Sequence, residues 1–269
     1  MKKLILFLTL CGTLSAQRIQ NSINNPLSSL GSLNLSGGVP KNIFVSHITS
    51  GNVDLYTPAA GKRALVSNFT VYNDSAGTPT GYPEVKVSAT YYPLASVAAT
   101  IAANTTSNIV FGLILDSTTT LAFNAGTTAV INVWASIIEY DATVPVFSKY
   151  VAGLASGNNT IYTVTSGRTG CLLSTTSSNK DAAFGLNTGA KSVGYFNGSG
   201  GSRTITVNLV PSGGSVATTN LFGFSISTGN NALYAGAVGS ACLSAGDFVN
   251  IATDANTATQ FAWVNVIEQ

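Results

Sequence analysis

Two segments of this chain, 106 residues apart, carry the same pattern of small, aromatic and basic residues. Residues 50–62 and residues 156–168 both read S-G-N-x-x-[LI]-Y-T-x-x-x-G-[KR]. A second shared pattern, W-x-x-x-I-E, begins at Trp134 and again at Trp263, which are the two tryptophans of the chain. Because both patterns recur in the same order, the sequence predicts a tandem duplication of one domain.

The spacing between the two copies grows along the chain. The offset of 106 residues at the first pattern also places Asn73 on Asn179, whereas the offset at the tryptophans is 129. The second copy therefore carries about 23 extra residues. We expect these residues in the Gly/Ser-rich stretches 197–201 and 211–215.

The duplication divides the chain into four parts. We expect the first domain at residues 43–141 and the second at residues 146–269, joined by a short connector. Residues 17–42 are polar and rich in Gly, Ser and Asn, which is typical of an extended arm or linker. Residues 1–16 form a separate apolar leader.

Composition favours an all-β fold. Hydrophobic residues make up 45% of the chain and charged residues only 8%, so the polar surface consists mainly of Ser, Thr, Asn and Gly. Amphipathic helices normally carry Lys and Glu on their solvent face. Short β-rich runs alternate with turn residues, which predicts about seven to nine strands per domain. The fold class is therefore two tandem antiparallel β-sandwiches of the jelly-roll or immunoglobulin-like type.

The leader resembles a secretory signal peptide. Lys2 and Lys3 precede an apolar run, and small residues lead to a cleavage site expected near Ala16. The alternative is an uncleaved apolar arm packed inside an assembly. A membrane span needs about 20 apolar residues, and the run is shorter, so we expect no stable membrane span.

The formal net charge of +2 comes from the two lysines of the leader. Without the leader, basic and acidic residues balance. Nucleic-acid binding needs clustered Lys and Arg, so we expect no nucleic-acid partner.

Residues that could support catalysis or metal binding are scarce. His47 is the only histidine and aligns with Gly153, so a surface position is the simpler interpretation. Glu139 and Glu268 occupy the same position of the repeat, which favours a shared structural role over a catalytic pair. We expect no catalytic residue, no metal site and no cofactor, and therefore no enzyme.

Cys171 and Cys242 both lie in the second copy and lack the Cys-x-x-Cys spacing of metal sites. They would form one disulfide in an exported protein, or remain buried thiols in a particle assembled in the cytosol. The Gly61-Lys62 pair lacks the spacing of a phosphate-binding loop, so it indicates a turn between strands. Five tyrosines that do not repeat between the copies could stack on sugars, but packing is the simpler role: Tyr82, Tyr91, Tyr92, Tyr195 and Tyr234.

The closing strand of each copy is apolar on both faces. One face carries Trp134 and Ile138 in the first copy, and Trp263 and Ile267 in the second. A sheet with one wet side would alternate apolar and polar residues. We therefore expect these four residues to contact another domain or subunit.

The [LI]-Y-T-x-x-x-G-[KR] start and the W-x-x-x-I-E end of each copy resemble the small β-sandwich modules of accessory virion proteins of tailed phages, of the decoration, head-fibre or tail type. The resemblance covers roughly residues 43–269. It implies a non-enzymatic structural protein that builds or decorates a virion or another extracellular assembly, with copies of itself or other assembly proteins as partners. The leader departs from this family, which leaves open a secreted bacterial surface protein that binds glycans or host surfaces. The expected location is the virion or the extracellular space, after export if the leader is cleaved.

Overall fold

The computed structural model describes residues 38–269, except residues 96, 98, 110–112, 127–129, 173–192, 219–221, 229–231, 237–240 and 257. The leader and most of the predicted arm lie outside the described residues. The described part is all-β and antiparallel. The strands of the first copy are β1 (Val39–Val45), β2 (Gly51–Tyr56), β3 (Lys62–Asn73), β4 (Gly81–Val87), β5 (Thr90–Pro93), β6 (Thr106–Ile109), β7 (Leu113–Asp116), β8 (Thr119–Ala125) and β9 (Ile131–Asp141). Those of the second copy are β10 (Val146–Ala152), β11 (Gly157–Thr163), β12 (Gly170–Leu172), β13 (Val193–Asn197), β14 (Arg203–Val210), β15 (Phe222–Thr228), β16 (Ala232–Gly236), β17 (Cys242–Leu243), β18 (Phe248–Thr253) and β19 (Gln260–Glu268).

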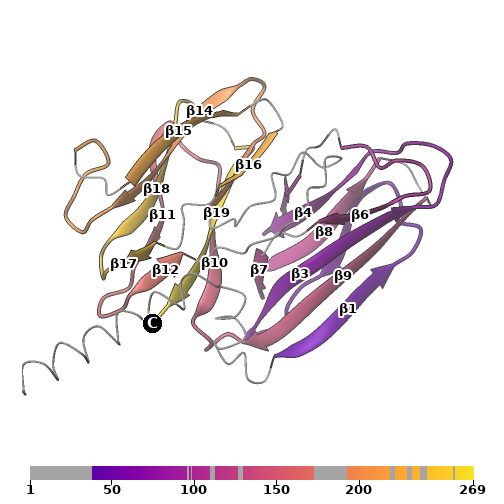
Figure 1. Ribbon diagram of the computed structural model, residues 1–269, viewed down its shortest axis with the longest axis horizontal. Coiled ribbons are helices and arrows are strands. Elements are labelled where there is room, and N and C mark those ends of the chain that lie inside the picture. Colours follow the sequence, from indigo (N-terminus) through magenta and orange to yellow (C-terminus); the bar gives the residue numbers. More distant parts are fainter. Residues whose placement is uncertain are drawn as a thin grey trace, which may run out of the picture. The chain divides into compact units, whose positions relative to one another are not determined.

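The first copy consists of two antiparallel sheets. Sheet A has the order β1-β9-β3-β6, with β7 also paired to β3, and sheet B has the order β2-β8-β4-β5. Figure 1 shows β1, β9 and β3 side by side. Along the chain, the strands alternate between the sheets as A, B, A, B, B, A, B, A, with β6 and β7 counted as one interrupted strand. This alternation defines a jelly roll.

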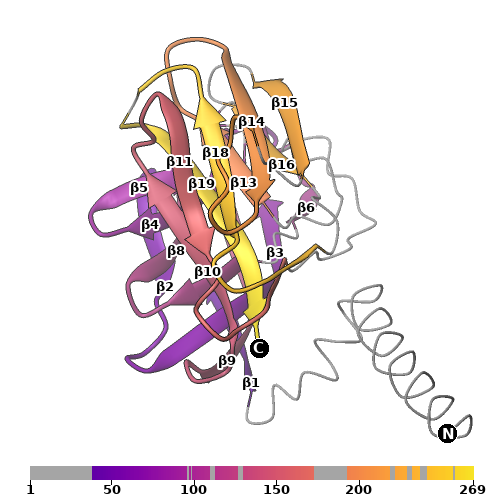
Figure 2. The same cartoon turned by 90° about the vertical axis from the view of Figure 1, so that its left-hand side faces the viewer.

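The second copy repeats this topology. Sheet D contains β10, β19, β12, β13, β16 and β17, and sheet E has the order β11-β18-β14-β15. Figure 2 shows the strands of sheet E side by side. The strand β19 corresponds to β9, since each is flanked by the first strand of its copy and by the third. Both copies are therefore jelly rolls, which is one of the two fold types expected from the sequence.

The strand registers locate most of the extra residues of the second copy, and they differ from the expected position. The single strand β3 corresponds to two strands, β12 and β13, which pair with the same neighbour. Asn73 lies opposite Ile131, and Asn197 lies opposite the equivalent residue Gln260. Asn197, rather than Asn179, is therefore the counterpart of Asn73. The insertion falls between β12 and β13, and not at residues 197–201.

The hydrogen bonds of the two asparagines support this equivalence. Oδ1 of Asn73 accepts hydrogen bonds from the backbone N–H and the hydroxyl of Ser75, at 3.0 and 2.8 Å. Oδ1 of Asn197 accepts hydrogen bonds from the same two groups of Ser199, at 3.1 and 2.6 Å. The side-chain nitrogens donate to the carbonyls of Gly77 and Gly201, at 2.8 and 3.0 Å respectively. An N-x-S-x-G turn thus closes the third strand of both copies.

The repeated glycines occupy left-handed backbone positions. Gly61 has a φ of 74° and Gly167 a φ of 76°, and each is the third residue of a turn closed by an i to i+3 hydrogen bond. Glycine reaches this conformation without steric cost, which explains why both turns retain it. The basic residue that follows starts the next strand in the first copy, so this motif is a strand connection.

The described domains begin with β1 at Val39, inside the segment expected as an arm. The described part contains no helix long and apolar enough to cross a membrane. Residues 37–269 form one compact unit, because apolar residues of both jelly rolls share a core.

Candidate assembly interface

Trp134 and Trp263 occupy the same place in the two jelly rolls but have different surroundings. Trp134 pairs with Phe44 on one side and Thr70 on the other. Trp263 pairs with the counterparts of these residues, Tyr150 and Gly194. Trp134 is 43% exposed, whereas Trp263 is 2% exposed.

Trp263 lies flat against the backbone of its neighbouring strand. A Cβ atom built on Gly194 would meet the indole of Trp263 at 2.0 Å, so only glycine leaves room for this ring position. In the first jelly roll, Thr70 stands at the equivalent position. The indole of Trp134 instead contacts the ring of Phe44, at 5.9 Å between centroids.

The outer face of sheet D is buried against the first jelly roll. Phe196, Phe261 and Trp263 belong to the same hydrophobic cluster as the core of the first sandwich. Phe261 stacks on Tyr92 at the end of β5, with ring centroids 4.5 Å apart. The first jelly roll therefore covers the tryptophan face of the second.

Hydrogen bonds add directionality to this internal contact. The hydroxyl of Ser148 donates to Oδ1 of the buried Asn265 at 2.5 Å, and it accepts the backbone N–H of Ile114 at 3.2 Å. Tyr150 donates its phenolic hydrogen to the carbonyl of Ile114. The edge strand β7 of the first jelly roll thus binds the outer face of sheet D through its backbone.

The equivalent face of sheet A is open in the described structure. Phe44 is 60% exposed and Tyr72 is 38% exposed, and both lie on the same face as Trp134. We call this surface the Trp134 face. Its exposed and half-buried positions on β1, β3 and β9 are Pro40, Asn42, Phe44, Asn68, Thr70, Tyr72, Asn132, Trp134, Ser136 and Ile138.

The Trp134 face is neutral as well as aromatic. Its ten positions carry no ionisable side chain apart from the phenol of Tyr72. Ser136 donates a hydrogen bond to Asn42 at 3.1 Å, and the indole nitrogen of Trp134 donates to Ser136 at 3.3 Å. Exposed aromatic surface without charge is characteristic of protein interfaces.

The structure separates the four residues predicted as assembly contacts into two groups. Trp134 lies exposed and Ile138 half-buried on the Trp134 face. Trp263 and Ile267 are buried within the chain. The sequence interpretation missed Phe44 and Tyr72. The signal that could have found them is the aromatic residue retained at the equivalent positions, Tyr150 and Phe196.

The repeated glutamate has a structural role in both copies. Glu139 accepts hydrogen bonds from Lys41, at 2.7 Å, and from Tyr56. These two donors, Lys41 foremost, lower the pKa of Glu139. Glu268 accepts hydrogen bonds from Tyr162, at 2.9 Å, and from a backbone amide. Each tyrosine–glutamate pair ties one sheet of the sandwich to the other.

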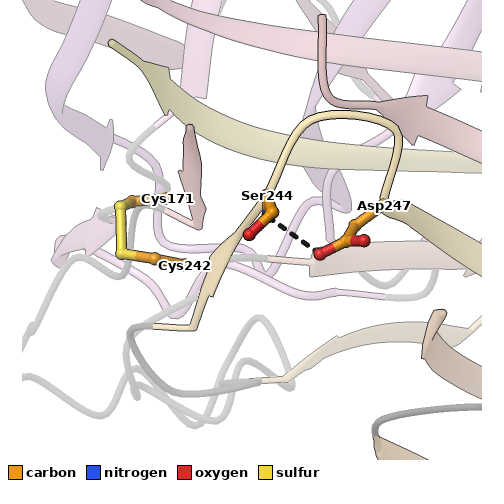
Figure 3. The surroundings of a disulfide bond; sticks show 4 residues. All are labelled: Cys171, Cys242, Ser244 and Asp247. Carbon is orange, nitrogen blue, oxygen red and sulfur yellow. Dashed lines mark hydrogen bonds between the residues drawn. A yellow bond between two sulfur atoms is a disulfide. The ribbon is translucent and has the colours of Figure 1, made fainter. Parts of the chain in front are cut away.

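Cys171 of β12 and Cys242 of β17 are joined by a disulfide bond (Figure 3). The strand β17 has two residues. In the following turn, Asp247 accepts the backbone N–H groups of Ser244 and Ser212, each at 2.8 Å. Asp247 therefore stabilises the turn.

The remaining candidate residues do not converge on one site. His47 lies at the rim of sheet A, where Nε2 is 3.0 Å from a carboxylate oxygen of Asp74. Tyr82 and Tyr91 lie half-buried on the outer face of sheet B, whereas Tyr92 is part of the internal contact. Tyr195 is buried in the second sandwich, and Tyr234 lies opposite it in β16. Among the described residues, no group of three or more His, Cys, Asp or Glu residues could hold a metal ion.

The fold and this surface define a protein of two tandem jelly rolls with one buried and one open aromatic face. No protein-family model and no curated protein sequence matches the chain. Solved structures that resemble it include viral capsid proteins. A chain from the structure of Sulfolobus turreted icosahedral virus is 14% identical, with 86% of this chain and 59% of that chain covered and a TM-score of 0.25.

Two further structures have similarly low scores. The major capsid protein P2 of bacteriophage PM2 is 7% identical, with 85% of this chain and 96% of that chain covered and a TM-score of 0.28. PNGF-II is 8% identical, with 85% of this chain and 65% of that chain covered and a TM-score of 0.31. This chain thus spans about three fifths of the virus chain, and at these scores none of the likenesses assigns a function.

Proposed function

We propose that this chain is a non-enzymatic structural subunit of a virion or of another extracellular assembly. The observation that carries the proposal is the difference in burial between the two equivalent sheet faces. One is buried by a jelly roll of the same chain, while the other is aromatic, neutral and open in the described structure. Jelly rolls occur as modules of viral capsids, and the cores of protein interfaces are rich in aromatic residues and poor in charge.

The internal architecture supports a building or decorating role. The two repeated motifs hold the sheets of each sandwich together through the Tyr56–Glu139 and Tyr162–Glu268 hydrogen bonds. The single histidine pairs with an exposed aspartate at the rim of a sheet. The residues that repeat between the copies thus maintain the fold and the packing of its modules.

Mass spectrometry of purified particles from the producing culture tests the proposal. We expect peptides of this chain to copurify with the particles in a fixed ratio to their other proteins. The first residue detected, Met1 or Gln17, shows whether an unprocessed subunit or a processed secreted protein assembles. Recovery of the chain only as a free protein in the culture supernatant would contradict the proposal.

One observation favours glycan binding as a second candidate function. The outer face of sheet B presents Tyr91, whose hydroxyl donates to Asp54 at 2.9 Å, beside Lys86 at 2.6 Å from the same carboxylate. An aromatic ring next to polar groups can stack on a sugar. Binding on a glycan array that is lost in the Tyr91→Ala variant would support this candidate.

A further inference from the structure

The Trp134 face and the buried outer face of sheet D share most of their aromatic positions. Phe44, Tyr72 and Trp134 correspond by strand register to Tyr150, Phe196 and Trp263, so three aromatic positions recur in both copies. At two other positions the copies differ, because Asn132 replaces Phe261 and Thr70 replaces Gly194. The Ser136–Asn42 hydrogen bond corresponds to the Ser148–Asn265 bond, with serine and asparagine exchanged between the strands.

In the second copy, this set of residues binds another jelly roll. Phe196 is 3% exposed and Trp263 is 2% exposed, because the first jelly roll packs over them. The covering surface belongs to the side of the sandwich where β5 and β7 lie, through the ring of Tyr92 and the backbone of Ile114. A face with the same three aromatic positions is thus seen in contact with a module of the same fold.

The internal contact joins two unlike surfaces, the sheet face of one module and the strand-edge side of the other. Such a heterologous contact leaves one surface of each kind unused in the chain. The Trp134 face is the unused sheet face, and β15 is the edge strand equivalent to β5. Repetition of the contact between chains would place the edge of the second jelly roll of one chain on the Trp134 face of the next.

The exposed apolar residues concentrate on this one sheet. Among the residues that the structure describes, the large apolar side chains that remain exposed are Val39, Phe44, Tyr72 and Trp134, all on strands of sheet A. The absence of charge at the described positions of the Trp134 face disfavours a nucleic acid or an anionic lipid surface, which would require Lys or Arg. A neutral protein surface fits better.

We infer that a second copy of this chain covers the Trp134 face, in a head-to-tail contact that repeats the contact between the two jelly rolls. The inference rests on the proposed structural function and specifies its partner. Because each chain offers one face and one edge, association continues beyond a dimer into a ring or a filament.

Sedimentation of the full chain at about 1 to 100 µM tests the inference, since this range detects the affinities of weak assembly contacts. We expect wild-type chains to form species larger than dimers. Trp134→Arg places a charge in the centre of the contact and should weaken association about tenfold or more. Ala89→Arg, at the exposed turn between β4 and β5, adds the same charge elsewhere and should associate as wild type.

A second variant and a second measurement guard against loss of folding. Phe44→Ser removes the most exposed of the three rings and should also weaken association, with an unchanged circular dichroism spectrum. Radical footprinting should show that Trp134 becomes protected only as the concentration of wild-type chain rises. A monomer with Trp134 accessible, a species that stops at the dimer, or unchanged association of Trp134→Arg would each overturn the inference.

A wild-type monomer in which Trp134 is already protected would also overturn it, and would indicate that residues 1–37 of the same chain cover the face. These outcomes are separate from the test of the proposed function. A chain that copurifies with particles but stays monomeric in isolation is a structural protein whose Trp134 face binds a different partner.

Discussion

Tyr162 donates a hydrogen bond to Glu268 at 2.9 Å, and so links the tyrosine of one repeated motif to the glutamate of the other. The residues come from β11 and β19, which belong to opposite sheets of the second sandwich. Tyr56 and Glu139 make the same bond in the first sandwich. The two motifs recur together because their side chains form one contact.

We predict that Tyr162→Phe lowers the free energy of unfolding by about 1–2 kcal/mol, since the ring remains but a hydrogen bond to a half-buried carboxylate is lost. Urea denaturation measures the change. Tyr91→Phe removes an equivalent bond to Asp54 at an exposed site and should cost less than about 0.5 kcal/mol. Equal effects of the two substitutions would show that the Tyr162 bond is no more than a surface contact.

Gly194 should not tolerate a side chain. In Gly194→Ala, the new methyl group would occupy space held by the Trp263 ring, so the ring must move and disturb the contact between the jelly rolls. We expect a loss of about 2–3 kcal/mol, typical of overpacking. Gly200→Ala is the control, because a Cβ there meets no atom within 4 Å. Equal melting temperatures of the two variants would contradict the prediction.

Glu84 should make stability depend on pH. Its side chain is 3% exposed, and burial, followed by the charge of Asp54, raises its pKa from 4.5 to about 7. The unfolded chain loses this proton near pH 4.5 and the folded chain only near pH 7. This group therefore reduces stability as pH rises from about 4.5 to about 7.

We expect Glu84→Gln to raise the melting temperature relative to wild type at pH 8, and to have a smaller effect at pH 4.5. Differential scanning calorimetry across this range measures the difference. Asp54→Asn removes the neighbouring charge, so the melting temperature of this variant should depend less steeply on pH than that of wild type. A Glu84→Gln effect that is constant with pH would contradict the prediction.

His47 holds a backbone conformation that suits glycine. Its φ is 50°, and its counterpart in the second copy is Gly153, with a φ of 65°. His47→Gly should raise the free energy of unfolding by about 0.5–1 kcal/mol, because the left-handed region is costly for other residues. His47→Ala removes the contact with Asp74 but keeps the strain, so it should show no gain. A loss of stability in His47→Gly would indicate that the Asp74 contact outweighs the strain.

The Cys171–Cys242 disulfide closes a loop with a sequence separation of 71 residues. The double variant Cys171→Ser, Cys242→Ser should lose about 4 kcal/mol, since the unfolded chain gains conformational freedom. Denaturation with and without reductant measures this change, and thiol labelling of the native protein should find neither cysteine free. Full labelling without reduction would show that the pair remains as thiols.

Much of the architecture could be predicted because it depends on local patterns. Turn residues between short apolar runs indicated strands, and the positive φ of Gly61 and Gly167 explains why the turns repeat in sequence. The insertion in the second copy was misplaced for a physical reason. The N-x-S-x-G turn at Asn197 is short, and its pairing opposite Gln260 and its hydrogen bonds reveal that it matches the turn at Asn73.

The sequence by itself determined the duplication, the all-β class and the neutral surface, since these follow from composition and spacing. Only the tertiary structure decided which of the two tryptophans is buried. Each tryptophan lies between the equivalent two strands of its sheet. Its burial depends on what packs across the sheet face, which is set by residues far away in the chain. Gly194 and Tyr92 bring Trp263 into the core of a neighbouring jelly roll, while Thr70 and an open face leave Trp134 at the surface.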